Sequence, residues 1–179
     1  MRSWSFDIQI ASFFHSQVDS SYRTSIVSDW PYTRGRISAP RWWDLGFDDN
    51  SWSGAVYGAN LPPDSVSRPC SECEWIWGDN HVDPNETTIF RKRFSIPSGV
   101  TITDAAIRMS ADNEAWGYVG YINGHYFGKV PELGSGDNPH TFGLESFLHS
   151  GNNLLAVQTS NGADDRAGLA YTMTIRYHD

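Results

Sequence analysis

The sequence lacks any long apolar run. No segment of its 179 residues has the roughly 20 consecutive apolar residues that a membrane-spanning helix needs. The N-terminal segment also lacks the unbroken apolar core of an export signal, because Asp7 and Gln9 interrupt it. The sequence therefore predicts no membrane span and shows no signal peptide.

Charge and cysteine are scarce as well. Charged residues make up 19% of the chain and the formal net charge is −8, which argues against non-specific nucleic-acid binding through a basic field. The two cysteines, Cys70 and Cys73, are half of a zinc site without a second half, and the six His show no metal-binding spacing. We interpret the pair as a short disulfide or two free thiols in a loop, and the sequence leaves both open.

Long helical patterns are missing, whereas aromatic residues are plentiful at 14% of the chain. Aromatic and β-branched residues flank Asn123-Gly124, and an Asn-Gly pair is the strongest short signal for a β-hairpin. A two-residue turn there predicts three opposed pairs, which are Ile122–His125, Tyr121–Tyr126 and Gly120–Phe127. The chain is thus predicted to be built around a hairpin.

Further strands are predicted, most of them from period-two alternation. The segments are residues 4–10, 74–77, 88–96, 105–111, 154–159 and 169–177. The fifth of these alternates little and is expected to be buried on both faces, whereas the last has a clear apolar face from Leu169 to Tyr177. Residues 144–150 are expected to form one short helical turn.

Short strands with turn signals about every ten residues, and no long helix, predict an all-β fold. The expected architecture is an antiparallel β-sandwich or jelly roll. Residues 41–179 are assigned to the sandwich domain, and residues 1–40 to an N-terminal segment that is either an arm or a first strand.

Several pieces of the chain, in this order, resemble the galactose-binding-domain-like family of β-sandwiches. They are residues 45–52 (LGFDDNSW), 75–77 (WIW), 90–94 (FRKRF), 111–114 (ADNE), 121–124 (YING) and 151–157 (GNNLLAV). These jelly-roll modules are attached to many glycoside hydrolases and occur in lectins. The resemblance covers residues 42–178 and implies the fold, but the fold alone does not fix the function.

Opposed catalytic carboxylates are not evident in the sequence. Acidic residues occur in loops, but nothing pairs them, and no nucleophile motif, phosphate-binding loop or His-based metal site is found. The adjacent Asp48 and Asp49 are interpreted as turn caps. We therefore expect a protein without catalytic activity.

Carbohydrate recognition is the expected function. Sugars are held by exposed aromatic faces and planar polar side chains, and in the family the ligand usually sits among loops at one end of the sandwich. The candidate ligand-binding residues are Trp77, Asp79, Asn80, His81, Trp116, Asp164 and Arg166. The alternative for each Trp is packing in the core or between strands.

No cofactor is required for this function, but some members of the family hold a structural Ca²⁺. Asp112, Asn113 and Glu114 are the candidate oxygen ligands here. The expected partner is a carbohydrate or glycan surface, in an extracellular or virion setting. The rival prediction is a virion or other assembly protein, such as a phage capsid decoration or tail component. A chain that starts at its own Met without an export signal suits it, and residues 1–40 would be its docking arm.

Overall fold

The computed structural model describes residues 6–9, 15–18, 41–57, 67–78, 87–112, 118–130, 139–161 and 166–178. Within these residues the regular structure is almost entirely β. The strands are β1 (Phe6–Gln9), β2 (His15–Val18), β3 (Ser53–Gly54), β4 (Val56–Tyr57), β5 (Ile76–Trp77), β6 (Thr87–Ile96), β7 (Thr101–Asp112), β8 (Tyr118–Ile122), β9 (His125–Val130), β10 (His140–Gly143), β11 (Gly151–Ser160) and β12 (Gly168–His178). A single 3-10 turn, Glu145–Phe147, is found among the same residues.

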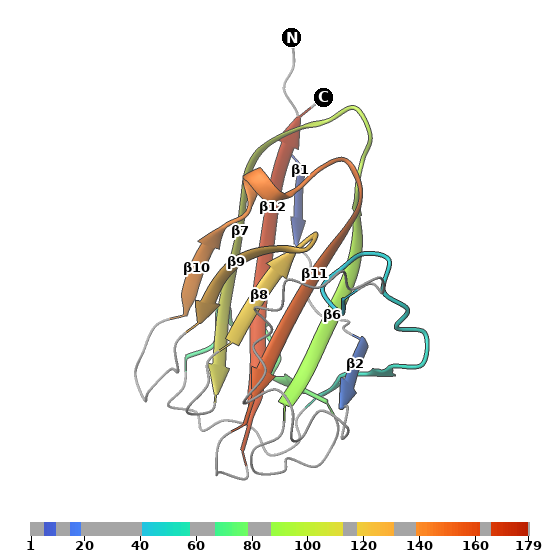
Figure 1. Ribbon diagram of the computed structural model, residues 1–179. Helices are drawn as coiled ribbons and strands as arrows, with labels where there is room; N and C mark the ends of the chain where they lie inside the picture. The colour runs from blue at the N-terminus through green and yellow to red at the C-terminus, as the bar shows by residue number, and fades with distance from the viewer. Residues whose placement is uncertain are drawn as a thin grey trace.

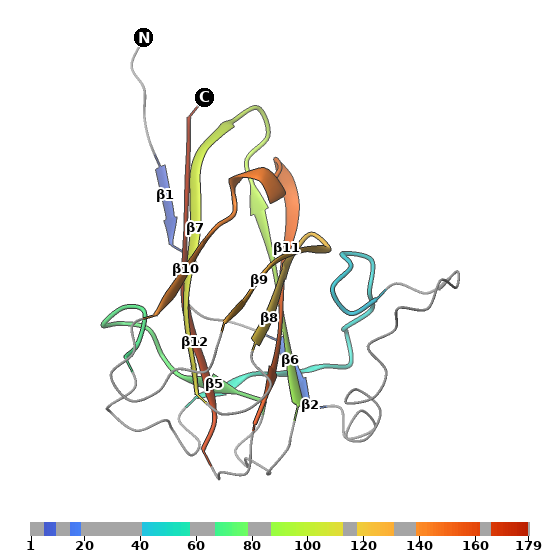
Figure 2. The same cartoon turned by 60° about the vertical axis from the view of Figure 1, so that its left-hand side comes forward.

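Two antiparallel sheets form the sandwich (Figures 1 and 2). Sheet A has the strand order β10-β7-β12-β5-β4, and β1 also pairs with β12. Sheet B has the order β3-β2-β6-β11-β8-β9. Figure 2 views the two layers nearly edge-on, with β7 and β12 in one and β11 and β6 in the other. The predicted all-β antiparallel sandwich is therefore confirmed.

The core lies between the inner faces of the sheets. On β7 the residues that alternate inward, Ala105, Ile107, Met109 and Ala111, are fully or almost fully buried. The inward face of β12 supplies Leu169, Tyr171, Met173, Ile175 and Tyr177. Strand periodicity places one face of each strand against the opposite sheet, so the alternation seen in the sequence correctly identified these residues.

Strand β11 is buried on both faces, as its weak alternation predicted. Leu155 and Val157 belong to the core, whereas Leu154 and Ala156 lie on the outer face of the same strand. All four are fully buried. The outer face of sheet B is therefore covered as well.

The β8–β9 hairpin turns at Asn123-Gly124, with φ angles of 51° and 83°. Positive φ at both central residues is the requirement of a type I′ turn. Ile122 pairs with His125 and Tyr121 with Tyr126, as predicted.

The third predicted pair is wrong, because Gly120 pairs with Gly128 after a register shift. The ring of Phe127 lies over Gly120, where an added Cβ would be 2.1 Å from its Cζ. A β-bulge thus turns Phe127 toward the core, and only a glycine leaves room for its ring.

The two N-terminal strands join opposite sheets. Strand β1 pairs with β12 in sheet A, and β2 pairs with β6 and β3 in sheet B. The division of the chain at residue 40 itself stays a prediction. None of the described residues belongs to a helix long and apolar enough to cross a membrane.

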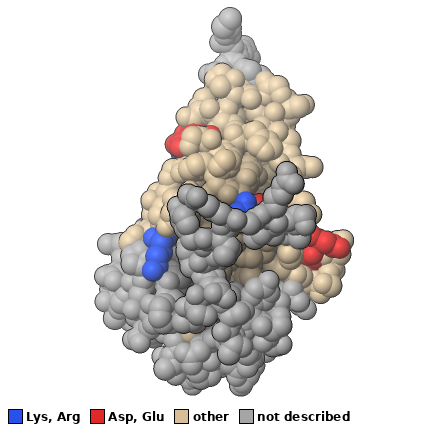
Figure 3. All heavy atoms as spheres, in the orientation of Figure 1, with Lys and Arg blue, Asp and Glu red and all other residues tan. Residues whose placement is uncertain are grey.

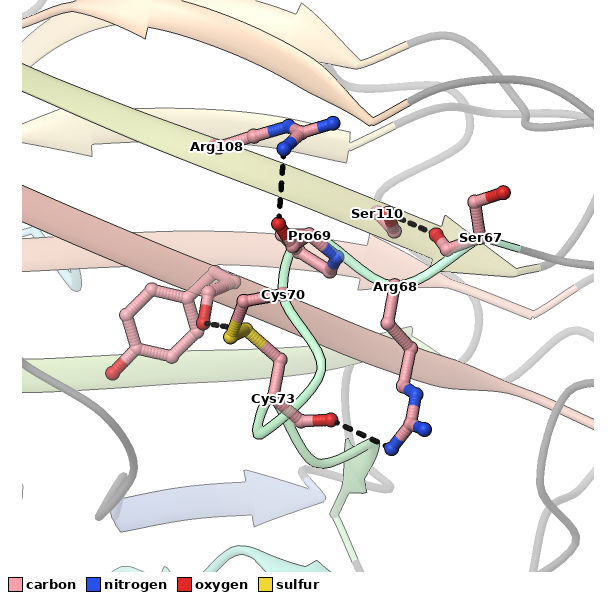
Figure 4. Close-up of a disulfide and its surroundings, with 8 residues drawn as sticks. Ser67, Arg68, Pro69, Cys70, Cys73, Arg108 and Ser110 are labelled. Atoms are coloured by element: carbon pink, nitrogen blue, oxygen red, sulfur yellow. Dashed lines mark hydrogen bonds between the residues drawn. A yellow bond between two sulfur atoms is a disulfide. The ribbon is translucent and has the colours of Figure 1, made fainter.

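The outer face of sheet A is covered by residues 67–75, which we name the sheet A cover (Figures 2 and 4). Arg108 and Ser110 point outward from β7 and donate hydrogen bonds to the carbonyls of Pro69 and Ser67, at 3.1 Å and 2.6 Å. Trp75 of the cover packs on Ala170 of β12. Side chains of the sheet thus hold the main chain of the cover.

Cys70 and Cys73 form a disulfide within the sheet A cover, so of the two open alternatives the structure has the disulfide. The Sγ atom of Cys73 lies 3.5 Å from the carbonyl oxygen of Tyr171, and Arg68 donates to the Cys73 carbonyl at 3.0 Å. The disulfide thus closes a short loop of the cover, and this loop lies against sheet A.

Candidate functional site

Residues 41–52 run across the outer face of sheet B, and we name them the sheet B cover. Figure 2 shows this segment outside the layer that contains β6, β8 and β11. Its anchor is Arg91 of β6, whose side chain points away from the core and is 2% exposed as a residue. The guanidinium donates to the carbonyls of Trp42 and Asp44, both at 3.1 Å, and pairs with Asp49 at 3.2 Å.

Asp49 is therefore not a turn cap, and that prediction is wrong for this residue. Its buried carboxylate forms ion pairs with Arg91 and with Arg93, two residues further along β6. Asp48 does act as a cap, because its Oδ1 accepts a hydrogen bond from the backbone nitrogen of Asn50 at 3.1 Å. Two adjacent acids thus have different roles, set by which way each points.

Burial lowers the pKa of Arg91, and the nearby Asp49 carboxylate opposes this effect. The rings of Phe47 and Trp52 lie 5.1 Å and 5.8 Å from its guanidinium carbon. Arginine remains charged throughout the range in which proteins fold, so a permanent buried cation is surrounded by one carboxylate, two carbonyls and two rings. The cover is fixed in position by these contacts.

An aromatic cluster forms where the start of the cover meets the β8–β9 hairpin, and it consists of Trp42, Trp43, Tyr121 and Tyr126. Trp43 and Tyr121 stack nearly parallel, with centroids 4.9 Å apart and 9° between the planes. Trp42 meets both rings edge-on at 4.9 Å and 5.4 Å. Tyr126 meets Tyr121 at 5.9 Å and 63°, so it extends the cluster without stacking on it.

Two charged side chains, Arg41 and Asp44, lie beside the aromatic cluster. The guanidinium carbon of Arg41 lies 4.9 Å from the centroid of the Trp43 ring, and its Nε is 3.5 Å from the Asp44 carboxylate. Burial, and then Tyr126, raise the pKa of the Tyr121 phenol, whereas Arg41 lowers it. Asp44 also approaches the hairpin turn, because a Cβ on Gly124 would be 3.4 Å from its Oδ1. The cover and the hairpin meet at this cluster.

A shallow depression of roughly 340 Å³ lies beside the cover. It is lined by Leu45, Arg93, Phe94, Ser95 and Asn152. Ser95 donates to the Asn152 amide oxygen at 2.8 Å, and Arg93 donates to the Phe47 carbonyl at 2.9 Å. The polar lining groups are therefore held by neighbours.

Trp77 does not have the exposed ring that a sugar-stacking role requires. It is 1% exposed, belongs to the core, and its ring centroid is 6.2 Å from that of Phe90. For this residue the structure shows core packing, the alternative that the sequence left open.

Most of the other predicted site residues are not among the residues that the structure describes. Asp79, Asn80, His81, Asn113, Glu114, Trp116 and Asp164 lie outside the described residues. Arg166 is exposed just before β12, and Asp112 is half-buried at the end of β7. No group of three metal-ligating side chains occurs among the described residues, and the Ca²⁺ site at residues 112–114 stays a prediction.

The sequence-based search for site residues missed the aromatic cluster. A signal for half of it was present, since the predicted register put Tyr121 opposite Tyr126, and cross-strand neighbours share a face of a sheet. The contribution of Trp42 and Trp43 could not be foreseen, because nothing local indicates that residues 42 and 43 come to lie on β8.

No protein-family model matches the chain. A curated α-L-rhamnosidase from Streptomyces avermitilis is 31% identical to it over 140 residues, which are 73% of this chain. The chain spans 13% of the length of that curated relative.

Two solved structures are similar in fold. A β-glucuronidase from Bacteroides uniformis covers 96% of this chain with 18% of its own, at 16% identity and a TM-score of 0.52. A β-glucuronidase from Ruminococcus gnavus covers 90% with 23% of its own chain, at 12% identity and a TM-score of 0.52. These likenesses agree with the β-sandwich; the galactose-binding-domain-like assignment itself stays an interpretation.

Proposed function

We propose that this chain is a non-catalytic recognition module that binds carbohydrate and forms part of a larger carbohydrate-active protein. The observation that carries the proposal is the match to a small part of an α-L-rhamnosidase, together with a fold that recurs as a small part of β-glucuronidases. A segment that recurs as a minor portion of large enzymes acts beside their chemistry more readily than in place of it.

The geometry of sheet B supports the same function. Its outer face presents aromatic rings, a guanidinium and a carboxylate together, and these groups match the apolar C–H faces and the hydroxyls of sugars. Figure 3 shows only separate small areas of charge on the described surface of one face. A described surface with little charge suits a hydroxyl-rich ligand better than a nucleic acid.

The disulfide supports an extracellular setting for the proposed module. Disulfides persist in oxidising compartments and are rare in a reducing cytosol. The Cys70–Cys73 bond therefore agrees with a ligand that is met outside the cell.

A glycan panel tests the proposal. The purified chain is titrated by calorimetry with α-L-rhamnosides, β-glucuronides and β-galactosides, and each sugar is also assayed for hydrolysis. We expect saturable binding of at least one sugar and no turnover. Turnover would overturn the non-catalytic part of the proposal, and absence of binding to every sugar would overturn the recognition part.

Light scattering in the same samples separates the rival function, a virion or assembly protein. We expect a monomer whose size is unchanged by the sugar. A stable oligomer that binds none of the glycans would favour the assembly alternative and contradict the proposal.

A further inference from the structure

Resting on the proposed function, we infer that the sugar binds on the outer face of sheet B, with the C–H face of a pyranose ring against Tyr126. This position differs from the loops at the end of the sandwich, where the sequence placed the site. The inference depends on the exposure of Tyr126, on the support behind it and on the polar groups beside it.

Tyr126 is unusually open for an aromatic residue in a strand. It is 55% exposed, and the other large hydrophobic residue that is exposed among the described residues, Leu45, reaches only 40%. Its ring meets that of Tyr121 at 63°, so Tyr121 does not stack flat on it. A flat, accessible phenol ring is the kind of surface on which sugar C–H groups stack.

The support behind Tyr126 is rigid. The Tyr121 ring cannot rotate freely, because Trp43 stacks on it at 4.9 Å and Trp42 packs against it in a T-shaped contact. The hairpin that carries both tyrosines is tied to β11, since the Asn123 side chain accepts a hydrogen bond from the Leu154 backbone nitrogen at 2.8 Å. A ring that is already held in place loses little conformational freedom on binding.

Groups that can bind hydroxyls lie on the same cluster. The exposed Arg41 and the half-buried Asp44 form a pair beside Trp43 and the hairpin turn, and they offer both donors and acceptors. Charged groups make stronger hydrogen bonds to hydroxyls than neutral ones do. A pyranose, which has an apolar face and a rim of hydroxyls, matches this combination.

Three variants of the full chain test the inference by calorimetry with the best sugar from the panel. We expect Tyr126→Ala to weaken binding roughly tenfold or more, and Tyr126→Phe to stay within about threefold of the parent, because the ring face remains. Arg176→Ala is the control, since it removes an exposed side chain from β12 of sheet A, away from the proposed site, and it should bind like the parent. Thermal melts verify that each variant is folded.

The parent chain gives a second readout that needs no variant. In NMR titrations with the sugar, the amides of β9 near Tyr126 should shift most. Equal affinity of Tyr126→Ala and the parent, or shifts confined to residues outside β8, β9 and the sheet B cover, would overturn the inference and leave the proposed function standing. Failure of the parent to bind any sugar would instead overturn the proposed function.

Discussion

The two covers of the sandwich are held by different chemistry. In the sheet A cover, Arg108 and Ser110 of β7 bind main-chain carbonyls, and a disulfide closes the loop. In the sheet B cover, Asp49 provides a carboxylate that pairs with a buried arginine of β6, and aromatic side chains complete the contact.

This difference bears on why we place the proposed binding surface at the sheet B cover. Carbonyls are present at every residue, so the hydrogen bonds that Arg108 and Ser110 donate do not depend on which side chains the sheet A cover carries. The sheet B cover depends on particular side chains, and it ends in rings that continue onto an exposed tyrosine. Burying a charge without its partner is costly. The sheet B cover is therefore expected either to keep the position in which Asp49 pairs with Arg91 or to detach from the sheet as a whole.

The largest expected effect comes from removing the carboxylate of the sheet B cover. Asp49→Ala leaves the Arg91 guanidinium buried without a counter-ion, which should lower the free energy of unfolding by about 3 kcal/mol. Urea denaturation followed by tryptophan fluorescence measures the change.

The neighbouring acid provides the control. Asp48→Ala removes one exposed cap and should cost about 1 kcal/mol or less. Equal losses for the two variants would show that the ion pair does not anchor the cover.

A smaller loss is expected from opening the sheet A cover. Replacing Cys70 and Cys73 together by Ser frees a very short loop, which should lower the free energy of unfolding by about 2 kcal/mol. The carbonyls would still be held by Arg108 and Ser110. Sugar binding should be unchanged, because the two covers lie on opposite faces (Figure 2). A loss of affinity equal to that of Tyr126→Ala would contradict the separation of the covers.

The smallest expected effect on stability comes from the Glu72 carboxyl, in the sheet A cover. A hydrogen bond from the Ser71 side chain, and then one from its own backbone, lower the pKa of this carboxyl. Because the folded-state pKa lies below that of the unfolded chain, the contribution to stability is present above the unfolded value and is lost as the pH falls through the folded value.

An NMR titration of the Glu72 carboxyl measures this pKa directly. It should lie below the ordinary glutamate value in the parent and rise toward that value in Ser71→Ala. An unshifted pKa in the parent would mean that the tip of this cover is not ordered by the Ser71 contact.

The sequence predicted what depends on neighbouring residues. The Asn123-Gly124 turn and the alternation of β7 and β12 follow from local conformational preferences and from periodicity, and both are confirmed. The bulge beyond Tyr121 was missed, because it depends on how the Phe127 ring fits over Gly120 inside the sandwich. Periodicity carries no information about such packing.

The chemistry of the candidate site depends on partners that are far apart in the chain. Asp49 looked like a cap because only its neighbours are visible in a sequence, whereas Arg91 lies 42 residues away. The same distance problem hid the stacking of Trp43 on Tyr121. Trp77 looked suitable for a ligand because composition does not tell which side of a strand faces the core.

The hydrogen bonds of Asn123 also bear on how the protein ages. Its amide nitrogen donates to Phe147 at 2.9 Å and to Asn153 at 2.8 Å, while its oxygen accepts from Leu154. Deamidation of an Asn-Gly pair begins when the glycine nitrogen attacks this amide, which must first leave its partners. Hydrolysis of the resulting cyclic imide gives isoaspartate and aspartate, so their slow appearance at position 123 would report transient opening of the hairpin tip.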